Sequence, residues 1–309
     1  MEMKSVFVLG GNTDQVPYIK ELLRVGYKIH LSDNNPICPG RAFCHEFYEV
    51  GYDNLKMLED IARKIVSNGE KCRAFSASAQ YALKAAARIA SIFEQSFPKH
   101  ATIEMCLDKA KFYKAFSECS IPIPISYFVE SPDQLARVYR KLNKEKKYYL
   151  KSDLGKSPNY IYRISPKNFD IKLVNWKKDR YLDKGYVLQE EFIGTHLRLN
   201  FHKKGFNIFD FFSGKPVSVK DIKNYYVPQI VGPLRGFINR YELTDFVVKF
   251  DVIANLQGWV ALDIGLDPPF RMKASYEDQG LDFVKGYVRH LLDGKDDYES
   301  SEIEYERAN

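Results

Sequence analysis

Short apolar runs alternate with amphipathic segments over roughly the first hundred residues of the chain. Val6–Leu9 is apolar at every position, which predicts a strand buried on both faces. Lys28–Ser32 and Arg73–Ser76 are predicted as further strands, while Asn54–Asn68 and Tyr81–Phe93 carry apolar residues at helical spacing. Strands that alternate with helices in this way predict an α/β domain with a parallel sheet and right-handed crossovers.

The pattern changes after this α/β region. Asp108 is placed to cap a helix, and Ser131, followed by Pro132, marks the start of another. Between them, Ile121–Pro124 contains two prolines, each of which holds the preceding residue in extended geometry. Further strands are predicted at Tyr148–Leu150, Tyr160–Ile164, Tyr186–Leu188, Leu197–His202, Phe206–Phe212, Trp259–Ile264 and Phe270–Lys273. The remaining elements of this α+β region are two helices, predicted at Glu242–Asn255 and Leu281–Leu292.

Composition and charge narrow the function classes. Of the 309 residues, 45% are hydrophobic and 28% are charged, which is ordinary for a globular protein. The net charge of +6 suits anionic ligands such as nucleotides. Acidic residues are interspersed among the basic ones, and we interpret the basic runs Lys141–Lys147 and Lys177–Arg180 as solvated helix faces or loops. We therefore expect no nucleic-acid partner.

Five cysteines are scattered along the chain, at Cys38, Cys44, Cys72, Cys106 and Cys119. Their odd number and the absence of a C-x-x-C pair argue against a disulfide framework and against a zinc site. Reduced thiols are typical of cytoplasmic proteins. The first apolar run is too short for a signal peptide, and no stretch approaches the ~20 apolar residues of a membrane span. We therefore expect a cytoplasmic protein without a membrane partner.

Two lysines stand in a distinctive order of motifs. Asp108-Lys109 is followed by Phe112 and then by Ile121–Pro124, and Lys151 follows Tyr149-Leu150 just before a polar loop. This order resembles the ATP-grasp superfamily of carboxylate–amine and carboxylate–thiol ligases. The likeness is to the branch with a pre-ATP-grasp domain, as in carbamoyl phosphate synthetase and the purine-pathway ligases, and it covers nearly the whole chain.

The resemblance implies that Lys109 and Lys151 reach the phosphates of ATP. Lysines on a semi-enclosed surface neutralise the several negative charges that ATP carries. The loop Ser152–Asn159 would add backbone N–H groups where larger side chains would crowd the phosphates. The candidate residues of this loop are Ser152, Gly155, Lys156 and Ser157.

A second segment resembles the part of the family that binds adenine. Val187–Gly194 has the character of a strand that runs out into a short linker between two lobes. The resemblance implies that linker backbone groups bind the adenine edge and that apolar side chains cover the ring. The matching residues are Gln189, Glu190, Glu191, Phe192 and Ile193. His196 stands where the family usually has a Glu near the ribose, and a neutral histidine can also hydrogen-bond a hydroxyl.

The resemblance also implies a division of the chain. Residues 1–103 would form a pre-ATP-grasp α/β domain with a parallel sheet. Residues 104–185 and 186–295 would form the N-terminal and C-terminal lobes of a two-lobed α+β ATP-grasp domain, with ATP held between them. Residues 296–309 would form a flexible acidic tail.

The metal motif departs from the family pattern. Asp263 resembles the first metal-binding acid, and the family then carries Glu-x-Asn on a following strand. Here that strand is expected at Phe270–Ser275, with Lys273 and Ser275 in place of the Glu and the Asn. Magnesium prefers hard oxygen ligands, and a lysine repels it but can itself contact phosphate. Either Mg²⁺ is held by Asp263 with help from another acid, or the site is degenerate. The candidate helpers are Asp267, Glu277 and Asp278.

The first loop of the chain is a weaker candidate site. Gly10-Gly11-Asn12 together with Asp33 hints at a dinucleotide-binding fingerprint, but Asn12 and Gln15 occupy the later glycine positions, which argues against NAD. In pre-ATP-grasp domains this loop faces the acceptor substrate, so the resemblance makes Gly11, Asn12 and Asp33 substrate-side candidates. The histidines show no metal-ligand spacing, and neither a Walker A motif nor a nucleophile elbow is present.

Two functional hypotheses follow. In the first, the protein is an ATP-dependent carboxylate–amine ligase that forms an amide through an acyl-phosphate, with Mg²⁺ on Asp263 and small-molecule substrates. The loose phosphoryl-transfer transition state requires positioning and positive charge, which Lys109, Lys151 and Lys273 would supply. Arginines pair bidentately with carboxylates and phosphates, and the candidates are Arg198, Arg235 and Arg271. In the second, a degenerate ATP-grasp protein binds nucleotide or a partner without ligating. The sequence leaves the identity of both substrates and any oligomerisation open.

Overall fold

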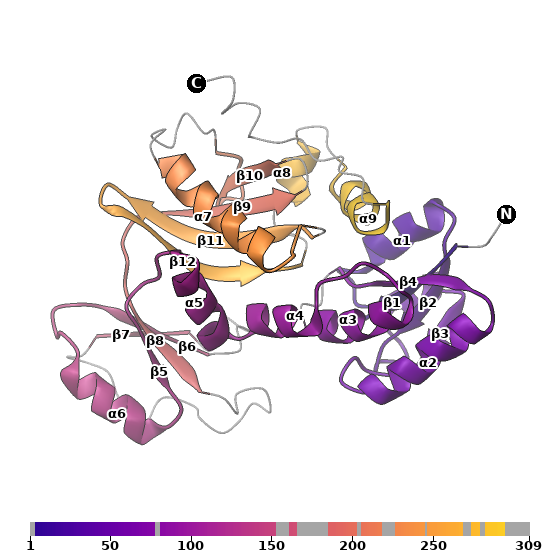
Figure 1. The fold of residues 1–309 in the computed structure, drawn as a ribbon, viewed down its shortest axis with the longest axis horizontal. Coiled ribbons are helices and arrows are strands. Elements are labelled where there is room, and N and C mark those ends of the chain that lie inside the picture. The colour runs from indigo at the N-terminus through magenta and orange to yellow at the C-terminus, as the bar shows by residue number, and fades with distance from the viewer. Residues whose placement is uncertain are drawn as a thin grey trace.

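The computed structural model describes residues 4–77, 81–152, 161–165, 185–202, 205–217, 226–244, 246–267, 273–278 and 282–293. Within these ranges the strands form three four-stranded sheets, which are spread along the molecule in Figure 1. The first sheet is parallel and the other two are antiparallel. The expected succession of an α/β domain and an α+β region is therefore confirmed.

The first sheet is the predicted parallel one, with strand order β3-β2-β1-β4. Its strands are β1 (Lys4–Leu9), β2 (Lys28–Ser32), β3 (Glu46–Tyr48) and β4 (Lys71–Phe75). The covering helices are α1 (Val16–Arg24), α2 (Leu55–Ser67) and α3 (Ala82–Ile92), with a 3₁₀ turn, η1 (Pro39–Phe43). Residues 5–9 of β1 are fully buried, because the central strand has apolar layers on both of its faces.

The second sheet has the order β5-β8-β6-β7. Its strands are β5 (Ser126–Val129), β6 (Tyr148–Ser152), β7 (Ile161–Ile164) and β8 (Tyr186–Glu190). Helix α6 (Pro132–Lys141) packs on one face and buries Leu135 against Leu150 and Leu188. The hydroxyl of Ser131 accepts a hydrogen bond from the Gln134 backbone N–H at 3.2 Å, so the predicted helix start is confirmed.

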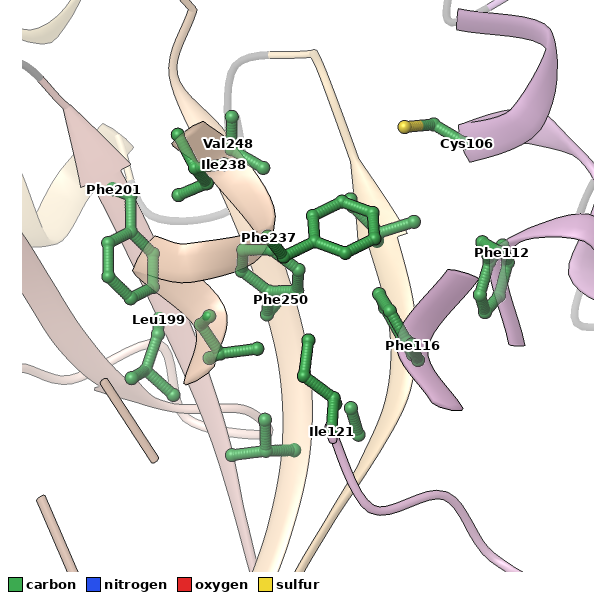
Figure 2. Packing of buried hydrophobic residues seen from close by; sticks show 14 of the residues in the cluster. Cys106, Phe112, Phe116, Ile121, Leu199, Phe201, Phe237, Ile238, Val248 and Phe250 are labelled. Atoms are coloured by element: carbon green, nitrogen blue, oxygen red, sulfur yellow. The ribbon is translucent and has the colours of Figure 1, made fainter. Parts of the chain in front are cut away.

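The third sheet has the order β10-β9-β11-β12. Its strands are β9 (Thr195–His202), β10 (Gly205–Asp210), β11 (Val248–Asn255) and β12 (Gly258–Gly265). Helices α4 (His100–Leu107), α5 (Lys109–Glu118) and α7 (Tyr226–Arg240) contribute to the core on one face. Figure 2 shows the rings of Phe116 from α5, Phe237 from α7 and Phe250 from β11. The centroid of the Phe116 ring lies 5.1 Å from that of Phe237 and 6.0 Å from that of Phe250. The opposite face carries polar side chains such as Arg198 and Asp251 together with apolar ones such as Phe209.

One predicted helix is wrong. Glu242–Asn255 was expected to be helical, but β11 occupies most of it and the helix of this region, α7, ends at Arg240. Val248, Phe250 and Val252 are buried and alternate with Lys249 and Asp251, which is the period of a strand. The apolar residues of this segment fit both periods, and its β-branched residues favour the strand that the neighbouring β9 and β12 complete.

A predicted strand is also wrong in the part that can be checked. Phe270–Ser275 was expected to be extended, yet Lys273–Glu277 forms the short helix α8. Residues 268–272, which include Arg271, lie outside the described ranges. The ammonium of Lys273 pairs with the Glu277 carboxylate one turn later, at 2.9 Å, which is a helical i, i+4 contact.

The last helix, α9 (Phe283–Asp293), confirms the predicted closing helix and packs against the first domain. The ring of Tyr287 lies 5.6 Å from Tyr18 of α1 and 6.1 Å from Phe75 of β4. Figure 1 shows α9 beside α1, with α8 of the third-sheet region next to it. Helix α9 therefore completes the core of the first domain. Residues 296–309, predicted as an acidic tail, lie outside the described ranges. Of the described helices, none combines the length and the apolar composition needed to cross a membrane.

Candidate functional site

A cavity of about 590 Å³ lies between the second and third sheets. Nine of the residues that the sequence suggests for nucleotide binding line it, together with the proposed metal acid Asp263. The nine are Lys109, Lys151, Ser152, Gln189, Glu190, Glu191, Phe192, Ile193 and His196. The other three candidates, Gly155, Lys156 and Ser157, lie outside the described residues. The fold therefore gathers side chains from α5, β6, β8, β9 and β12 that are far apart in the sequence.

Lys109 enters the cavity from the first turn of α5. The carboxylate of Asp108 accepts a hydrogen bond from the Lys111 backbone N–H at 3.1 Å, which confirms the predicted cap and fixes where the helix begins. The Lys109 ammonium lies 3.2 Å from the Asp263 carboxylate. The lysine side chain is 7% exposed and the aspartate side chain 43% exposed, so the acid keeps an open side.

Lys151 reaches the same cavity from β6. Its ammonium donates a hydrogen bond to the Gln189 side-chain oxygen at 2.7 Å. Burial, and then the nearby positive charge of Lys109, lower the pKa of Lys151 to about 8, although Asp263 and Asp251 act in the opposite direction. Lys151 is therefore mainly charged at neutral pH but loses its proton far below the ordinary lysine range.

Ser152 follows Lys151 at the edge of the cavity. Its hydroxyl is buried and has no hydrogen-bond partner among the residues that the structure describes. A buried hydroxyl without a partner is costly, which favours a polar ligand at this position. Ser152 also begins the predicted phosphate loop, whose remaining residues lie outside the described ranges.

The carboxylates of Glu190, at the end of β8, and of Glu191, in the linker that follows, are engaged by protein partners. Glu190 pairs with Lys146 at 2.5 Å, and Glu191 accepts hydrogen bonds from the Tyr149 hydroxyl at 3.0 Å and from Arg163 at 3.3 Å. Their own charges are thus largely compensated before any ligand is bound.

Two backbone N–H groups of the same segment already have hydrogen-bond partners. The N–H groups of Glu190 and Glu191 donate to the carbonyls of Ile125 and Lys147, at 2.9 Å and 2.8 Å. These contacts tie the linker to the second sheet. A ligand that needs backbone hydrogen bonds would have to use groups further along, around Phe192 and Ile193.

The linker also leans on the third sheet. Asn255 donates a hydrogen bond from its side-chain amide to the Ile193 carbonyl at 2.7 Å. At Gly194 an added Cβ would lie 2.4 Å from the Ala254 carbonyl oxygen, so only glycine allows this approach. The apolar side chains of Ile193 and Phe212 line the cavity and are 75% and 76% exposed. They form an uncovered apolar wall suited to a flat ring.

His196 lies on β9 beside this wall, with its ring 5.0 Å from that of Phe212. Burial, and then the charge of Lys151, lower the pKa of His196 from its ordinary value. The imidazole is therefore neutral at physiological pH, with one nitrogen that donates and one that accepts.

A second acid in the cavity was missed by the sequence analysis. Asp251 of β11 is directly opposite Asp263 in the register of β11 and β12, and both residues line the cavity. Arg198 of β9 donates to both oxygens of Asp251, at 2.6 Å and 2.8 Å. The signal that could have revealed Asp251 is the apolar–polar alternation of β11, which the helical interpretation hid. The other lining residues that the sequence analysis missed are Tyr149, Ile161, Gly194, Phe211, Phe212, Val252, Ile253 and Leu262.

The other acids suggested as metal helpers are not part of the cavity lining. Asp267 pairs with Lys249 at 2.8 Å and Glu277 pairs with Lys273. Asp278, too, is absent from the lining. Within the described ranges, no group of three or more His, Cys, Asp or Glu residues is close enough to hold a metal ion. Magnesium usually takes one or two protein carboxylates plus phosphate oxygens and water, and the half-exposed Asp263 fits that arrangement.

The four residues suggested for catalysis are not gathered in one place. Arg198 lies next to the cavity as the partner of Asp251, whereas Lys273 lies on α8 and does not line it. Arg235 lies on α7 with its guanidinium 5.7 Å from the Phe206 ring, on the other face of the third sheet. Arg271 lies outside the described residues.

The substrate-side candidates come together in the first domain, at the carboxyl ends of β1 and β2. The Gly11 backbone N–H donates to the Asp33 carboxylate at 2.6 Å, and the Asn12 side-chain oxygen accepts from the Gln15 N–H at 3.0 Å. Asp33 also accepts from the Asn35 N–H at 2.8 Å. Each of these polar contacts shapes the loop itself, and none of the three candidates lines the cavity between the antiparallel sheets.

Solved structures share this fold over nearly the whole chain. N5-carboxyaminoimidazole ribonucleotide synthetase from Thermotoga maritima is 16% identical, covers 97% of this chain and 78% of its own, and gives a TM-score of 0.70. An L-amino acid ligase from Bacillus licheniformis is 15% identical, with 94% and 74% covered and a TM-score of 0.65. The biotin carboxylase domain of the Hydrogenobacter thermophilus 2-oxoglutarate carboxylase, solved with MgADP and bicarbonate, is 14% identical, with 98% and 72% covered and a TM-score of 0.69.

These neighbours are ATP-grasp enzymes, so the predicted resemblance is confirmed at the level of the fold. No protein-family model and no curated protein matches the sequence. At identities of 16% or less the shared fold does not carry a substrate with it.

Proposed function

We propose that the protein binds ATP in the cavity between the second and third sheets and uses it to join a carboxylate to an amine. One observation carries this proposal: nine residues selected from the order of motifs in the sequence line a single cavity with the acid suggested for the metal. Residues scattered over β6, β8, β9 and α5 would meet in one place by chance only rarely.

The two antiparallel sheets would act as the two lobes that hold the nucleotide. Phosphates would lie against Lys109, Lys151 and the hydroxyl of Ser152, for which the described part of the chain offers no hydrogen-bond partner. The base would lie against the linker, on the apolar wall of Ile193 and Phe212. Since β8 pairs within the second sheet, we place the boundary between the lobes after strand β8 and not before it.

The neutral His196 is suited to hydrogen-bond a ribose hydroxyl, in the place where the resemblance suggested a Glu. Mg²⁺ would be held by Asp263 together with phosphate oxygens, and when bound it would neutralise charge on the transferred phosphoryl group. Asp251 faces Asp263 but has both oxygens engaged by Arg198, so its role would be to shape the edge of the metal site.

The proposed reaction has two steps. A substrate carboxylate oxygen attacks the terminal phosphorus, the bond to ADP breaks, and an acyl phosphate forms. The amine then attacks the acyl carbon, phosphate leaves, and loss of a proton gives the amide. The positive charges of Lys109 and Lys151 would compensate the negative charge of the phosphoryl group during its transfer. Gly11, Asn12 and Asp33 remain proposed contacts of the acceptor substrate, and both substrates are small molecules in this proposal.

Isothermal titration calorimetry with ATP, in the presence and absence of Mg²⁺, tests the binding step. We expect Mg²⁺ to strengthen ATP binding. Release of ADP would then be measured with pairs of small carboxylates and amines, and activity should require both members of a pair. If ATP fails to bind both with and without Mg²⁺, the proposal is wrong.

The same experiment distinguishes a ligase from the degenerate alternative, a protein that binds nucleotide or a partner without ligating. It rested on Lys273 and Ser275 in place of metal ligands on a strand, and the described part of that segment is the helix α8. ATP binding that is indifferent to Mg²⁺, together with no ADP release from any pair, would favour a protein that binds nucleotide without ligating.

A further inference from the structure

A buried chain of hydrogen bonds connects the two sheets beneath the cavity. The Lys151 ammonium donates to the Gln189 side-chain oxygen at 2.7 Å, and the Gln189 amide nitrogen donates to the Tyr113 hydroxyl at 2.6 Å. The Tyr113 hydroxyl in turn donates to the Leu262 carbonyl at 2.9 Å. Leu262 directly precedes Asp263 on β12. This series of hydrogen bonds therefore begins at Lys151 of the second sheet and ends at the residue before Asp263 in the third sheet.

The two side chains in the middle of this hydrogen-bond series are buried. Gln189 is 2% exposed and Tyr113 is 1% exposed. Burial raises the pKa of the Tyr113 phenol, so the hydroxyl keeps its proton at physiological pH. Buried polar groups need their partners, because a donor or acceptor left without one costs the full desolvation of that group. The bonds of this chain are thus strongly specified.

The direction of every bond follows from proton counting. A phenol has one hydrogen, and that of Tyr113 is given to the Leu262 carbonyl. The Tyr113 oxygen can therefore only accept from Gln189, so the amide must turn its nitrogen toward the tyrosine. Its oxygen then faces Lys151.

A second hydroxyl imposes the same orientation. Ser126 donates its hydrogen to the Pro124 carbonyl at 2.8 Å and accepts from the Gln189 amide nitrogen at 3.3 Å. Both N–H groups of the amide are thus aimed at acceptors. A flipped amide would face both hydroxyls with a lone-pair oxygen and would present a donor to the lysine.

The two lysines of the cavity are consequently held in different ways. Lys109 lies against a carboxylate, that of Asp263, and its charge is compensated. Lys151 lies against a neutral amide oxygen, which fixes the ammonium without cancelling its charge. A hydrogen bond to the charged form also favours protonated Lys151 against the cost of its burial.

We infer that Gln189 and Tyr113 are positioning residues that aim the Lys151 ammonium at the nucleotide phosphates and tie its place to the end of β12 that carries Asp263. This inference rests on the proposed function. It also changes the role of Gln189, which acts on the nucleotide through Lys151. Tyr113 has no other candidate role in the cavity, whose lining does not include it.

The variant Tyr113→Phe breaks the chain at its centre. The ring remains, but Gln189 loses its shorter bond, to Tyr113 at 2.6 Å, and keeps only the 3.3 Å bond to Ser126. The amide is then held less firmly, and so is Lys151. Calorimetry should show ATP binding weakened about tenfold. Adenosine, which lacks the phosphates, should bind unchanged. In a Lys151→Met background the same substitution should change ATP affinity by no more than about twofold, because the residue it positions is already gone.

Tyr287→Phe is the matched control. Tyr287 of α9 is also a fully buried tyrosine whose hydroxyl donates to a backbone carbonyl, that of Ser76, at 3.4 Å, but it packs against the first domain and does not line the cavity. It should cost similar stability and leave ATP affinity unchanged. Equal effects of the two substitutions on ATP affinity, or full additivity of Tyr113→Phe with Lys151→Met, would overturn the inference.

A nucleotide-free measurement separates this inference from the proposed function. Acetylation of Lys151 by a limiting dose of acetic anhydride, followed by peptide mass spectrometry, reports how firmly the amine is held. We expect several-fold faster acetylation in Tyr113→Phe and no change in Tyr287→Phe. If the unaltered protein fails to bind ATP but this difference is seen, the proposed function fails while the positioning stands. If ATP binds and the difference is absent, the positioning fails alone.

Discussion

The two sheets that enclose the cavity hold their charged groups by opposite means. In the second sheet, Lys151 is oriented by the neutral amide of Gln189. In the third sheet, Asp251 is neutralised by Arg198, and Asp263 lies against Lys109 from α5. The second sheet thus presents a positive charge to a ligand, and the third presents acids whose charges are already compensated.

The difference shows how a cavity can favour an anion without accumulating repulsion. If both lysines faced the cavity without counter-charges, each would disfavour the charge of the other. The pKa of Lys151 is lowered first by burial and then by this charge of Lys109. Pairing Lys109 with Asp263 limits this effect. A cation bound at Asp263 would replace Lys109 as its partner and would free a second positive charge for the ligand.

Breaking the ion pair of the third sheet should have the largest effect. Arg198→Met leaves the Asp251 carboxylate, whose side chain is 17% exposed, without the guanidinium that binds both of its oxygens, and the free energy of unfolding should fall by about 3–5 kcal/mol. Urea denaturation followed by circular dichroism measures this. The exposed pair of Arg240 and Glu118 provides the control, because Arg240→Met should change stability by about 1 kcal/mol or less. Similar losses in the two variants would contradict the structural importance of the buried pair.

Removing the positive charge of Lys151 in the second sheet should weaken ATP binding. Lys151→Met keeps the length of the side chain and deletes the ammonium, so ATP affinity should fall by about 1.5–3 kcal/mol, roughly 10- to 150-fold. Calorimetry gives the value directly. Lys144 is an exposed lysine in the loop before β6, and Lys144→Met should bind ATP as the unaltered protein does. Unchanged affinity in Lys151→Met would remove the contrast between the sheets.

The same lysine predicts a pH dependence. Since the pKa of Lys151 is lowered to about 8, ATP affinity should be full below that pH and should decline as the pH rises through it. An unperturbed lysine would show this decline only near its usual value of about 10.4. Titrations from pH 6.5 to about 9.5 should reveal the step, and Lys151→Met should lack it. A flat profile in the unaltered protein would mean that the Lys151 charge does not contribute.

The acid of the third sheet should control the response to magnesium. Asp263→Asn retains the shape of the side chain but weakens the cation site. The Mg²⁺ enhancement of ATP affinity, which we expect to be about tenfold or 1.4 kcal/mol, should then shrink to within about twofold. Asp267→Asn is the control, because Asp267 pairs with Lys249 away from the cavity lining. If both variants keep the full enhancement, magnesium is held elsewhere.

The apolar wall should contribute least. Phe212→Ala removes an exposed ring that would be only partly covered by a bound base, so ATP affinity should fall about threefold to fivefold, near 1 kcal/mol or less. Adenosine should lose affinity by the same factor, since the wall contacts the base and not the phosphates. A loss confined to ATP would place Phe212 at the wrong end of the nucleotide.

Local patterns explain why much of the architecture could be predicted from the sequence. A strand such as β1 is apolar throughout because both of its faces are buried, and Asp108 and Ser131 cap helices through contacts within three residues. The order of Lys109, Lys151, the linker and Asp263 was sufficient to identify residues that meet in one cavity. Each of these signals is short-range or depends only on sequence order.

The features that the sequence did not reveal depend on tertiary contacts. The segment that contains Asp251 satisfies both a helical and a strand period, and only pairing with β9 and β12 decides between them and brings Asp251 opposite Asp263. Arg235 looks like the other candidate arginines in the sequence, but helix α7 carries it to the far face of the sheet. Tyr113 is spaced like any core aromatic of a helix, and its role depends on a carbonyl 149 residues away.

By itself, therefore, the sequence determined the type and order of most elements and the residues that could meet a nucleotide, because capping, periodicity and motif order are written locally in the chain. Only the tertiary structure decided which acids share the cavity, which arginine stands beside it, and how Lys151 is aimed. Those properties depend on strand register and on hydrogen bonds between distant residues, which no local pattern encodes.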